Sequence, residues 1–250
     1  LGDQQAALFG QAGWNAGAGK ITYGTGSFIL LNTGSRLSIS KNHLVSTLAL
    51  QWSNGKKLYA LEGSAFICGA WIQWLRDQLK MIESSAESET LASSVKSSEG
   101  VVVIPALAGM GAPFWKPNAR GAIMGLTRGS DRRHLARASL EALCFQNRAL
   151  VEAMKKDAKG IKVDWRVDGG AVQNNLLMQI QADVLNQKIR RPVNLEATAT
   201  GVALLAGVSA NLLSLDDVAA LWKLEREFKP ENSKSYQDAY ARWLKAVSVL

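Results

Sequence analysis

Short apolar segments separated by turn residues make up most of the first sixty positions of the chain. After a helix predicted over residues 5–17, four strands are expected, because each apolar segment is bounded by glycine, asparagine or serine. The expected strands span residues 21–23, 28–31, 42–50 and 57–62. This order predicts a run of antiparallel hairpins.

The rest of the chain changes to helical periodicity interrupted by single strands. Apolar residues on one side of residues 131–157 predict the longest helix, and residues 64–79 form a second amphipathic pattern. Further helices are expected around Leu91 and Val95, after the glycine pair 169–170, and over residues 197–212, 215–222 and 235–249, and further strands at 101–107, 165–168 and 188–193. Hairpins followed by strand–helix alternation predict one α/β domain over residues 1–250, with a mixed sheet flanked by helices rather than a doubly wound Rossmann fold.

Composition narrows the class of protein. The 250 residues are 47% hydrophobic and 20% charged, which is typical of a soluble globular protein, and no apolar run reaches the ~18–20 residues of a membrane span. Cys68 and Cys144 have no CxxC or metal-ligand spacing, and we expect them to be reduced core residues of a cytoplasmic protein. His43 and His134 are too few and too isolated for a zinc site.

The net charge of +8 raises the question of nucleic-acid binding. However, the basic pairs are scattered with acidic residues between them, and no nucleic-acid-binding motif occurs. These pairs are Lys56-Lys57, Arg132-Arg133, Lys155-Lys156 and Arg190-Arg191. They predict a solvated basic surface without a nucleic-acid partner, which would also attract an anionic substrate such as a nucleotide.

Two glycine-rich turns are candidates for a phosphate or nucleotide site. Gly24-Thr25-Gly26 lies in the first hairpin turn, where backbone N–H groups and a hydroxyl could bind an anion, although an ordinary hairpin turn has the same composition. Asp168-Gly169-Gly170 lies between a strand and a helix, with Asn174 one turn further along. A helix N-terminus suits a nucleotide, and tight strand–helix packing is the alternative explanation.

A third candidate is a glycine inside the helix predicted over residues 64–79. Gly69 precedes Gln73 by four residues, so the two share one helix face. An interior helical glycine costs about 1 kcal/mol relative to alanine. Either a ligand that approaches the backbone or close helix–helix packing explains that cost.

The stretch LGDQQAALFGQ at the start of the chain places a carboxylate beside two amides, ahead of a predicted helix. Asp3 is a favoured N-cap residue, because its side-chain oxygen accepts an unpaired backbone N–H. The alternative is that Asp3 and Gln4 face a substrate. Taken alone, these residues leave both interpretations open.

Six segments, in chain order, together resemble the C-terminal half of the FGGY carbohydrate kinases. They are GDQQAALFGQ, TYGTGSF, LEGSAFICGAWIQWLRD, GAPFWKPNARGAIMGLTRG, HLARASLEALCFQ and VDGGAVQNNLLMQIQADVL. The presence of both GDQQ and TYGTGSF in one chain resembles the glycerol kinase branch of the family. The resemblance implies an actin-like ATPase (ribonuclease H-like) domain, and a second, N-terminal kinase domain of similar size that is absent from residues 1–250.

The resemblance also implies an activity, namely phosphoryl transfer from Mg-ATP to the 3-hydroxyl of glycerol, which gives sn-glycerol 3-phosphate. Asp3 matches the family's general base and contacts the substrate, Gln4 matches a polyol ligand, and Phe28 matches an aromatic residue that packs on the glycerol carbons. The residues that match nucleotide contacts are Thr25 and Gly26 at the phosphates, together with Gly69, Gln73, Gly170 and Asn174.

The implied partners are glycerol, ATP or ADP, the N-terminal domain and further copies in a homodimer or tetramer. Mg²⁺ is implied by ATP, without assigned ligands. Because the family's active site lies between two domains, we expect the isolated chain to bind nucleotide without turnover. Lys116, which stands where the family often has Asp, is expected near the nucleotide side.

Two other functions are compatible with the sequence. The chain could belong to another FGGY kinase, which acts on a ketopentose or a related polyol. It could also be a nucleotide-binding remnant without catalysis. The Asp3–Gln4 pair argues against the second alternative, because a pure binding module does not need it.

Overall fold

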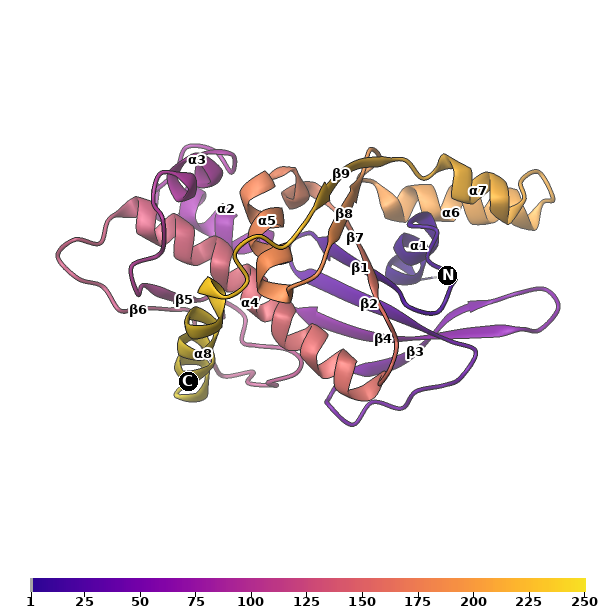
Figure 1. The fold of residues 1–250 in the computed structure, drawn as a ribbon, viewed down its shortest axis with the longest axis horizontal. Coiled ribbons are helices and arrows are strands. Elements are labelled where there is room, and N and C mark those ends of the chain that lie inside the picture. Colours follow the sequence, from indigo (N-terminus) through magenta and orange to yellow (C-terminus); the bar gives the residue numbers. More distant parts are fainter. Residues whose placement is uncertain (1) are drawn as a thin grey trace.

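A seven-stranded sheet forms the centre of the molecule in the computed structural model, which describes residues 2–250 (Figure 1). The strand order is β3-β4-β2-β1-β7-β8-β9, and the strands are β1 (Ala18–Tyr23), β2 (Ser27–Gly34), β3 (Val45–Gln51), β4 (Lys57–Ala65), β7 (Asp164–Asp168), β8 (Ile189–Pro192) and β9 (Leu224–Phe228). Strands β1 to β4 pair antiparallel, β7 is parallel to both β1 and β8, and β9 is antiparallel to β8. The predicted mixed sheet that begins with hairpins is confirmed.

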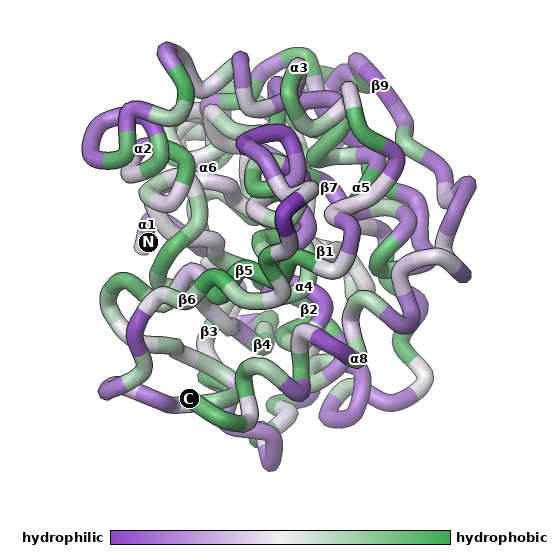
Figure 2. The backbone as a smooth tube through the Cα atoms, turned by 90° about the vertical axis from the view of Figure 1, so that its left-hand side faces the viewer, coloured by the Kyte–Doolittle hydropathy of each residue, from purple (hydrophilic) through white to green (hydrophobic). Residues whose placement is uncertain are grey.

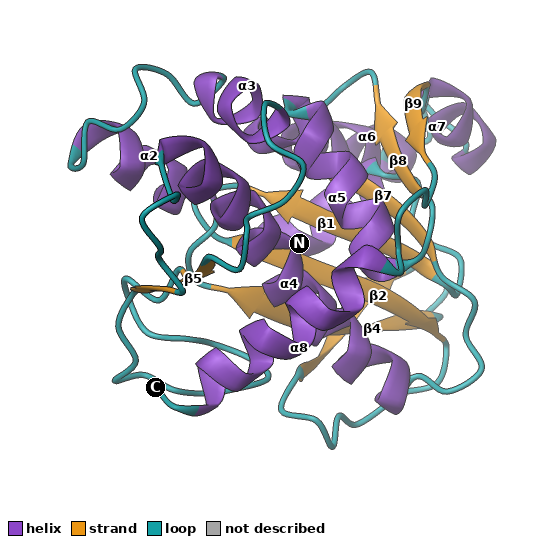
Figure 3. Cartoon of the chain, turned by 60° about the vertical axis from the view of Figure 1, so that its left-hand side comes forward, coloured by secondary structure: helices purple, strands orange, loops and turns teal. Residues whose placement is uncertain are grey.

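Helices cover both faces of this sheet (Figure 3). On one face, α1 (Asp3–Gly10) packs on β1 and β2 and against α6 (Ala197–Ser209). On the other face lie α4 (Arg132–Asp157) and α5 (Asn175–Leu185). The remaining elements are α2 (Gly69–Asp77), α3 (Glu87–Ser93), the 3₁₀ helix η1 (Gly170–Gln173), α7 (Leu215–Leu221), α8 (Ser235–Ser248), and a small sheet of β5 (Val102–Ile104) and β6 (Ala122–Met124).

The alternation of side chains along β2 shows why two helical layers are needed. Ile29 and Leu31 belong to the larger core, which includes α4 and α5, whereas Leu30 belongs to a smaller core with Leu8 and Phe9 of α1. Successive strand residues point to opposite faces, so a strand that is apolar on both faces must be covered twice.

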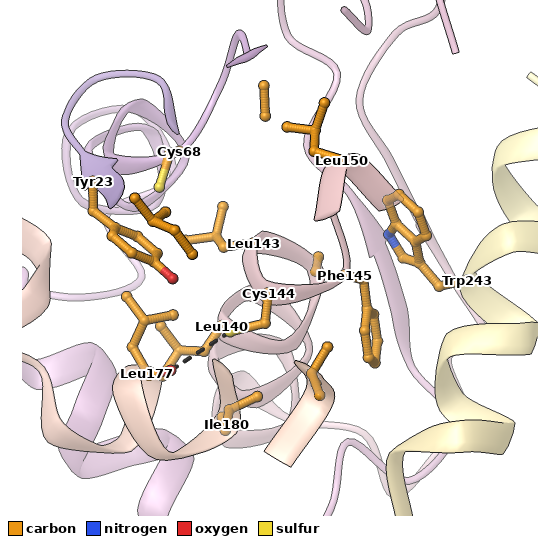
Figure 4. Close-up of a cluster of buried hydrophobic side chains, with 14 of the residues drawn as sticks. Tyr23, Cys68, Leu140, Leu143, Cys144, Phe145, Leu150, Leu177, Ile180 and Trp243 are labelled. Atoms are coloured by element: carbon orange, nitrogen blue, oxygen red, sulfur yellow. Dashed lines mark hydrogen bonds between the residues drawn. The ribbon is translucent and has the colours of Figure 1, made fainter. Parts of the chain in front are cut away.

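The larger core lies between the sheet and helices α4, α5 and α8 (Figure 4). Phe145 of α4 packs on Trp243 of α8 with ring centroids 6.1 Å apart, and the Cys144 thiol donates to the carbonyl of Leu177 at 3.5 Å. Cys68 and Cys144 are buried and free, as the sequence predicts. Figure 2 shows the hydrophobic segments gathered around β1, β2 and β5, with hydrophilic loops at the periphery.

Helix α1 is shorter than the sequence predicts. The apolar pattern suggested residues 5–17, but the helix ends at Gly10, and Ala12 adopts a left-handed conformation with φ of 52°. An L-residue in this conformation breaks a right-handed helix. The chain therefore turns early and enters β1 at Ala18.

The helix predicted over residues 64–79 also begins later, at Gly69, because Ser64 and Ala65 still pair with β2. The short strands β6 and β9 were not predicted at all. Elsewhere the predicted elements are present with shifted ends. Among residues 2–250, no helix combines the length and hydropathy needed to cross a bilayer.

Candidate functional site

A cavity of about 560 Å³ opens where the carboxyl ends of β1 and β7 lie side by side. The two strands are parallel, with Thr22 opposite Asp168, so the turn after β1 and the loop after β7 leave the sheet at the same edge. The cavity is lined by Tyr23, Gly24, Thr25, Gly69, Ile72, Gln73, Ser85, Ala86, Ser88, Glu89, Leu140, Leu143, Gly170, Ala171, Gln173, Asn174 and Leu177. Five of the six residues predicted to bind nucleotide are in this set, and Gly26 is not.

The β1–β2 turn is fixed by the beginning of α2. The backbone N–H of Gly69 donates to the carbonyl of Gly24 at 2.9 Å, and the N–H groups of Cys68 and Ala70 donate to the carbonyl of Thr25 at 2.8 and 3.1 Å. A Cβ atom at Gly69 would lie 2.7 Å from the Gly24 oxygen. Gly69 is therefore a glycine because two backbones meet there. The predicted interior position was wrong, since Gly69 is the first residue of α2.

Gly26 has a structural place outside the cavity. It is buried, and a Cβ atom there would lie 2.7 Å from the carbonyl oxygen of Ala65 in β4. Close packing against β4 explains this glycine. Gln73, by contrast, lies one helical turn after Gly69 and lines the cavity with it, as their spacing predicts.

The loop after β7 forms the opposite wall. Gly169 has φ of 90°, and a Cβ atom there would lie 2.5 Å from the carbonyl oxygen of Tyr23. Gly170 begins η1 with open space on its Cβ side. Asn174 is the N-cap of α5, where its Oδ1 accepts the Leu177 N–H at 2.8 Å. This wall presents a helix N-terminus, the feature that favours anionic ligands.

An arginine that the sequence showed only as part of a basic pair supports this wall. Arg191 of β8 is 7% exposed, and its guanidinium donates to the carbonyl of Val172 at 2.6 Å and to Oδ1 of Asn175 at 2.9 Å. Glu225 of β9 accepts from Nε at 2.6 Å. Because β9 was not predicted, the contact of Arg191 with Glu225 could not be anticipated from the sequence.

The second group of predicted residues lies on the α1 face of the sheet. Asp3 is exposed, its Oδ1 accepts the backbone N–H of Gln4 at 2.8 Å, and its Oδ2 accepts from Gln4 Nε2 at 3.2 Å. The interpretation of Asp3 as the N-cap was wrong, because Gly2 is the N-cap and Asp3 is the first residue of α1. Phe28 pairs across the strands with Thr22 and is half-buried.

A buried polar chain lies between the two groups. Lys20 of β1 is 0% exposed, and its ammonium donates to Gln4 Oε1 and, at 2.7 Å, to Thr22 Oγ1. The Thr22 hydroxyl donates to Asp168 Oδ1 at 2.5 Å, and Gln11 Nε2 donates to the other Asp168 oxygen at 2.8 Å. One chain of hydrogen bonds therefore joins the start of α1 to the carboxylate that precedes Gly169 and Gly170.

Burial shifts the pKa of both charged members of this chain. Desolvation lowers the pKa of Lys20 to about 8, against the opposing charges of Asp168, Glu62 and Asp3. Desolvation also raises the pKa of Asp168, although Lys20, Gln11 and Thr22 oppose the shift. Sequence reasoning missed Lys20. The expected strand began at residue 21, directly after Lys20, whereas β1 begins at Ala18 and therefore contains the lysine. A central strand rarely buries a charge without partners.

Lys116 lies away from the cavity, so its predicted position was wrong. Its ammonium donates to the carbonyl oxygens of Val247 and Ser248 at 2.8 and 3.3 Å. These carbonyls end α8, where a cation is favourable. Within residues 2–250, no group of three or more His, Cys, Asp or Glu side chains is placed to hold a metal ion.

Comparison with known proteins assigns the class. Residues 19–210 match the model of the FGGY family of carbohydrate kinases, C-terminal domain, so the chain belongs to this family. It is 52% identical to glycerol kinase 2 of Thermotoga maritima and 49% identical to glycerol kinase of Fusobacterium nucleatum, over 99% and 98% of its length. The chain spans about half the length of these curated relatives, 50% in each case.

The structural comparison agrees with this family. The fold matches a crystal structure of Plasmodium falciparum glycerol kinase with ADP, with a TM-score of 0.92 and 35% identity, over 99% of this chain and 50% of the other. A xylulose kinase from Lactobacillus acidophilus has a TM-score of 0.86 at 20% identity, over 98% of this chain and 50% of the other, which shows a shared fold alone. The predicted family and its actin-like ATPase fold are confirmed.

Proposed function

We propose that the chain is the C-terminal, nucleotide-binding half of an ATP-dependent glycerol kinase, which phosphorylates glycerol to sn-glycerol 3-phosphate. One observation carries the proposal. The residues that match the family's acceptor and nucleotide contacts form two separate groups, and the Lys20–Thr22–Asp168 chain joins them. Identity of about 50% to two glycerol kinases favours glycerol over other acceptors.

The cavity is the proposed adenine-nucleotide site. Gly69 and Gln73 on one wall and Gly170 and Asn174 on the other are placed to contact the base and ribose, and Thr25 offers a hydroxyl at the phosphate end. Apolar side chains such as Leu143 cover part of the wall, which suits a planar base. We propose no ligand contact for Gly26, whose role is to let the β1–β2 turn pack closely against β4.

The Asp3 carboxylate is the proposed general base. It is exposed and lies at the start of α1, where it can accept the proton of the attacking glycerol hydroxyl as phosphoryl transfer proceeds. Gln4 is the proposed polyol ligand, and Phe28 offers an apolar surface to the carbons. In reactions of this kind the protein contributes mainly positioning and electrostatic stabilisation.

Mg²⁺ is the proposed partner of ATP, bound mainly through the substrate phosphates and water. The described residues hold no cluster of three metal-ligating side chains, and the Asp168 oxygens are already engaged by Thr22 and Gln11. Mg²⁺ usually binds through one or two carboxylates together with substrate phosphates and water. Asp3 is the residue of this chain that we propose as a partner for the ion, and no step is derived through it.

We also propose that turnover of glycerol requires a second domain. The chain covers half the length of its relatives, and the Asp3 side chain is exposed to solvent. Exclusion of water strengthens the electrostatic interactions of a phosphoryl-transfer site. We therefore expect residues 1–250 alone to bind ADP and to leave glycerol unphosphorylated.

Calorimetry and turnover test the proposal together. ADP binding is measured by calorimetry with the 250-residue chain. Turnover is measured as glycerol-dependent ADP release by a fusion of the N-terminal half of T. maritima glycerol kinase 2 with this chain. This fusion is called the joined enzyme below. Saturable ADP binding and glycerol turnover are expected, with ketopentoses as competing acceptors. An absence of ADP binding, or a preference of the joined enzyme for a ketopentose, would contradict the proposal.

A further inference from the structure

Lys20 is a charge buried at the centre of the sheet. Its side chain is 0% exposed, and a buried ammonium group is stable only when its donors are satisfied. Two neutral oxygens accept from it, Gln4 Oε1 and Thr22 Oγ1. Within residues 2–250, Lys20 makes no ion pair shorter than 4.0 Å, so its negative neighbours Asp168 and Glu62 act at longer range.

The chemistry of the ammonium group fixes the orientation of the Gln4 carboxamide. A lysine ammonium donates hydrogen bonds and accepts none, so it selects the Oε1 atom of Gln4. The Nε2 group of Gln4 is then directed to Asp3, where it donates to Oδ2 at 3.2 Å. The opposite orientation would place a donor against a donor at Lys20.

Thr22 extends this arrangement to the other end of the site. Its hydroxyl oxygen accepts from Lys20 at 2.7 Å, so its proton is directed to Asp168 Oδ1 at 2.5 Å. Asp168 precedes Gly169, whose backbone lies against the carbonyl of Tyr23. Lys20 donates to both of its neighbours, Gln4 and Thr22, so the direction of the whole series is set by Lys20.

We propose that Lys20 is a positioning residue for phosphoryl transfer, which orients the Gln4 carboxamide and through it the Asp3 carboxylate, and which connects this pair through Thr22 to Asp168 at the nucleotide loop. This inference rests on the proposed glycerol kinase function. Lys20 does not touch the reacting atoms. Its effect is to keep the general base and the polyol ligand in one geometry.

The first test measures the contact itself and does not depend on activity. The Gln4 side-chain amide is followed by ¹⁵N NMR in the 250-residue chain as pH rises from 6.5 to 9.5, roughly 1.5 units on either side of the Lys20 midpoint. The charges facing Lys20 are Asp168 on β7, Glu62 on β4 and Asp3 on α1. We expect the Gln4 resonance to shift with a midpoint near pH 8, and to show no such shift in Lys20→Met.

The second test measures kinetics in the joined enzyme. Lys20→Met is expected to lower kcat/KM for glycerol at least about 10-fold, because misplacing a catalytic group by an ångström can cost far more. The Kd for ADP of the 250-residue chain is expected to change less than about 3-fold, since the cavity walls are held by other contacts. Lys20→Arg is expected to recover part of the loss and to shift the alkaline decline of activity to higher pH, because arginine keeps its charge.

Controls separate this role from a general effect on folding. Lys155→Met removes a lysine from the distant end of α4 and is expected to change none of these quantities. Thr22→Val keeps the shape of the strand and interrupts the series, so a smaller loss of kcat/KM is expected even if Lys20→Met fails to fold.

Two results would overturn the inference. One is a Gln4 resonance that is unaffected by pH and by Lys20→Met. The other is an active joined enzyme in which folded Lys20→Met, or Thr22→Val if Lys20→Met is unfolded, retains full kcat/KM for glycerol. A wild-type joined enzyme without glycerol turnover contradicts the proposed function instead, and the NMR titration then still decides the Lys20–Gln4 contact.

Discussion

The two ends of the site are built from different parts of the chain. The cavity is shaped largely by backbone, since the carbonyls of Gly24 and Thr25 accept from the start of α2. The Asp3–Gln4 end is shaped by side chains that are held by one buried lysine. Backbone walls exist as soon as the sheet and helices form. A side-chain constellation also needs a surrounding surface, and on the proposed function we therefore expect residues 1–250 to bind nucleotide without turnover.

The largest effect is expected from a substitution at the Asp3–Gln4 end of the site, which should lower kcat and leave ADP binding unchanged. Asp3→Asn in the joined enzyme is expected to lower kcat at least about 100-fold, because a positioned base typically contributes that much or more. The Kd for ADP should not change, since Asp3 lies outside the cavity. Asp216→Asn, an exposed acidic residue in the first turn of α7, is the matched control. Unchanged kcat in Asp3→Asn would reject Asp3 as the base.

The buried lysine gives the next largest effect, on stability. The folded pKa of Lys20 is about 8, below the value of 10.5 for a free lysine. Between these values the unfolded chain binds more protons than the folded chain, so the free energy of unfolding rises with pH from about 8 to 10.5. The full gain is on the order of 3 kcal/mol, and below pH 8 the cost of burying the charge is fully present.

Urea unfolding across this pH range measures that gain. Other groups titrate in the same interval, so the quantity of interest is the difference in slope between the wild type and Lys20→Met. The wild type should gain stability relative to the variant as pH rises. Parallel pH dependences would show that Lys20 keeps its ordinary pKa in the folded chain.

Two glycines at the nucleotide end allow an effect on the packing of the fold to be distinguished from an effect on ADP binding. Gly69→Ala is expected to destabilise the fold by about 1–3 kcal/mol, because its Cβ atom would press on the Gly24 carbonyl at 2.7 Å. Gly170→Ala has open space and should leave the melting temperature unchanged while it weakens ADP binding. Thermal unfolding and calorimetry on both variants measure the two effects. Equal melting temperatures would mean that the turn yields to the added methyl group.

The same contrast explains what the sequence could predict. Hairpins, the α4 periodicity and the glycine loops are local signals, and they predicted the antiparallel pairs β1–β2 and β3–β4 and five of the cavity residues as candidates, but not the order of the strands in the sheet. The Lys20–Gln4, Thr22–Asp168 and Arg191–Val172 contacts join residues more than 15 positions apart, and no local pattern encodes such contacts. Gly69 was misplaced because helix propensity did not reveal that β4 continues to Ala65.

The smallest expected effect tests whether the cavity wall is a specific contact surface. Gln73 lines the cavity one turn into α2, and a single hydrogen bond to a ligand contributes about 1 kcal/mol, or roughly a 5-fold change in Kd. Gln73→Ala should therefore weaken ADP binding by that factor, with no change in stability because the side chain is exposed. Gln78→Ala, at the C-cap of the same helix, is the matched control. If both variants bind ADP like the wild type, the nucleotide does not use this face of α2, and the loop after β7 would have to provide the specific contacts.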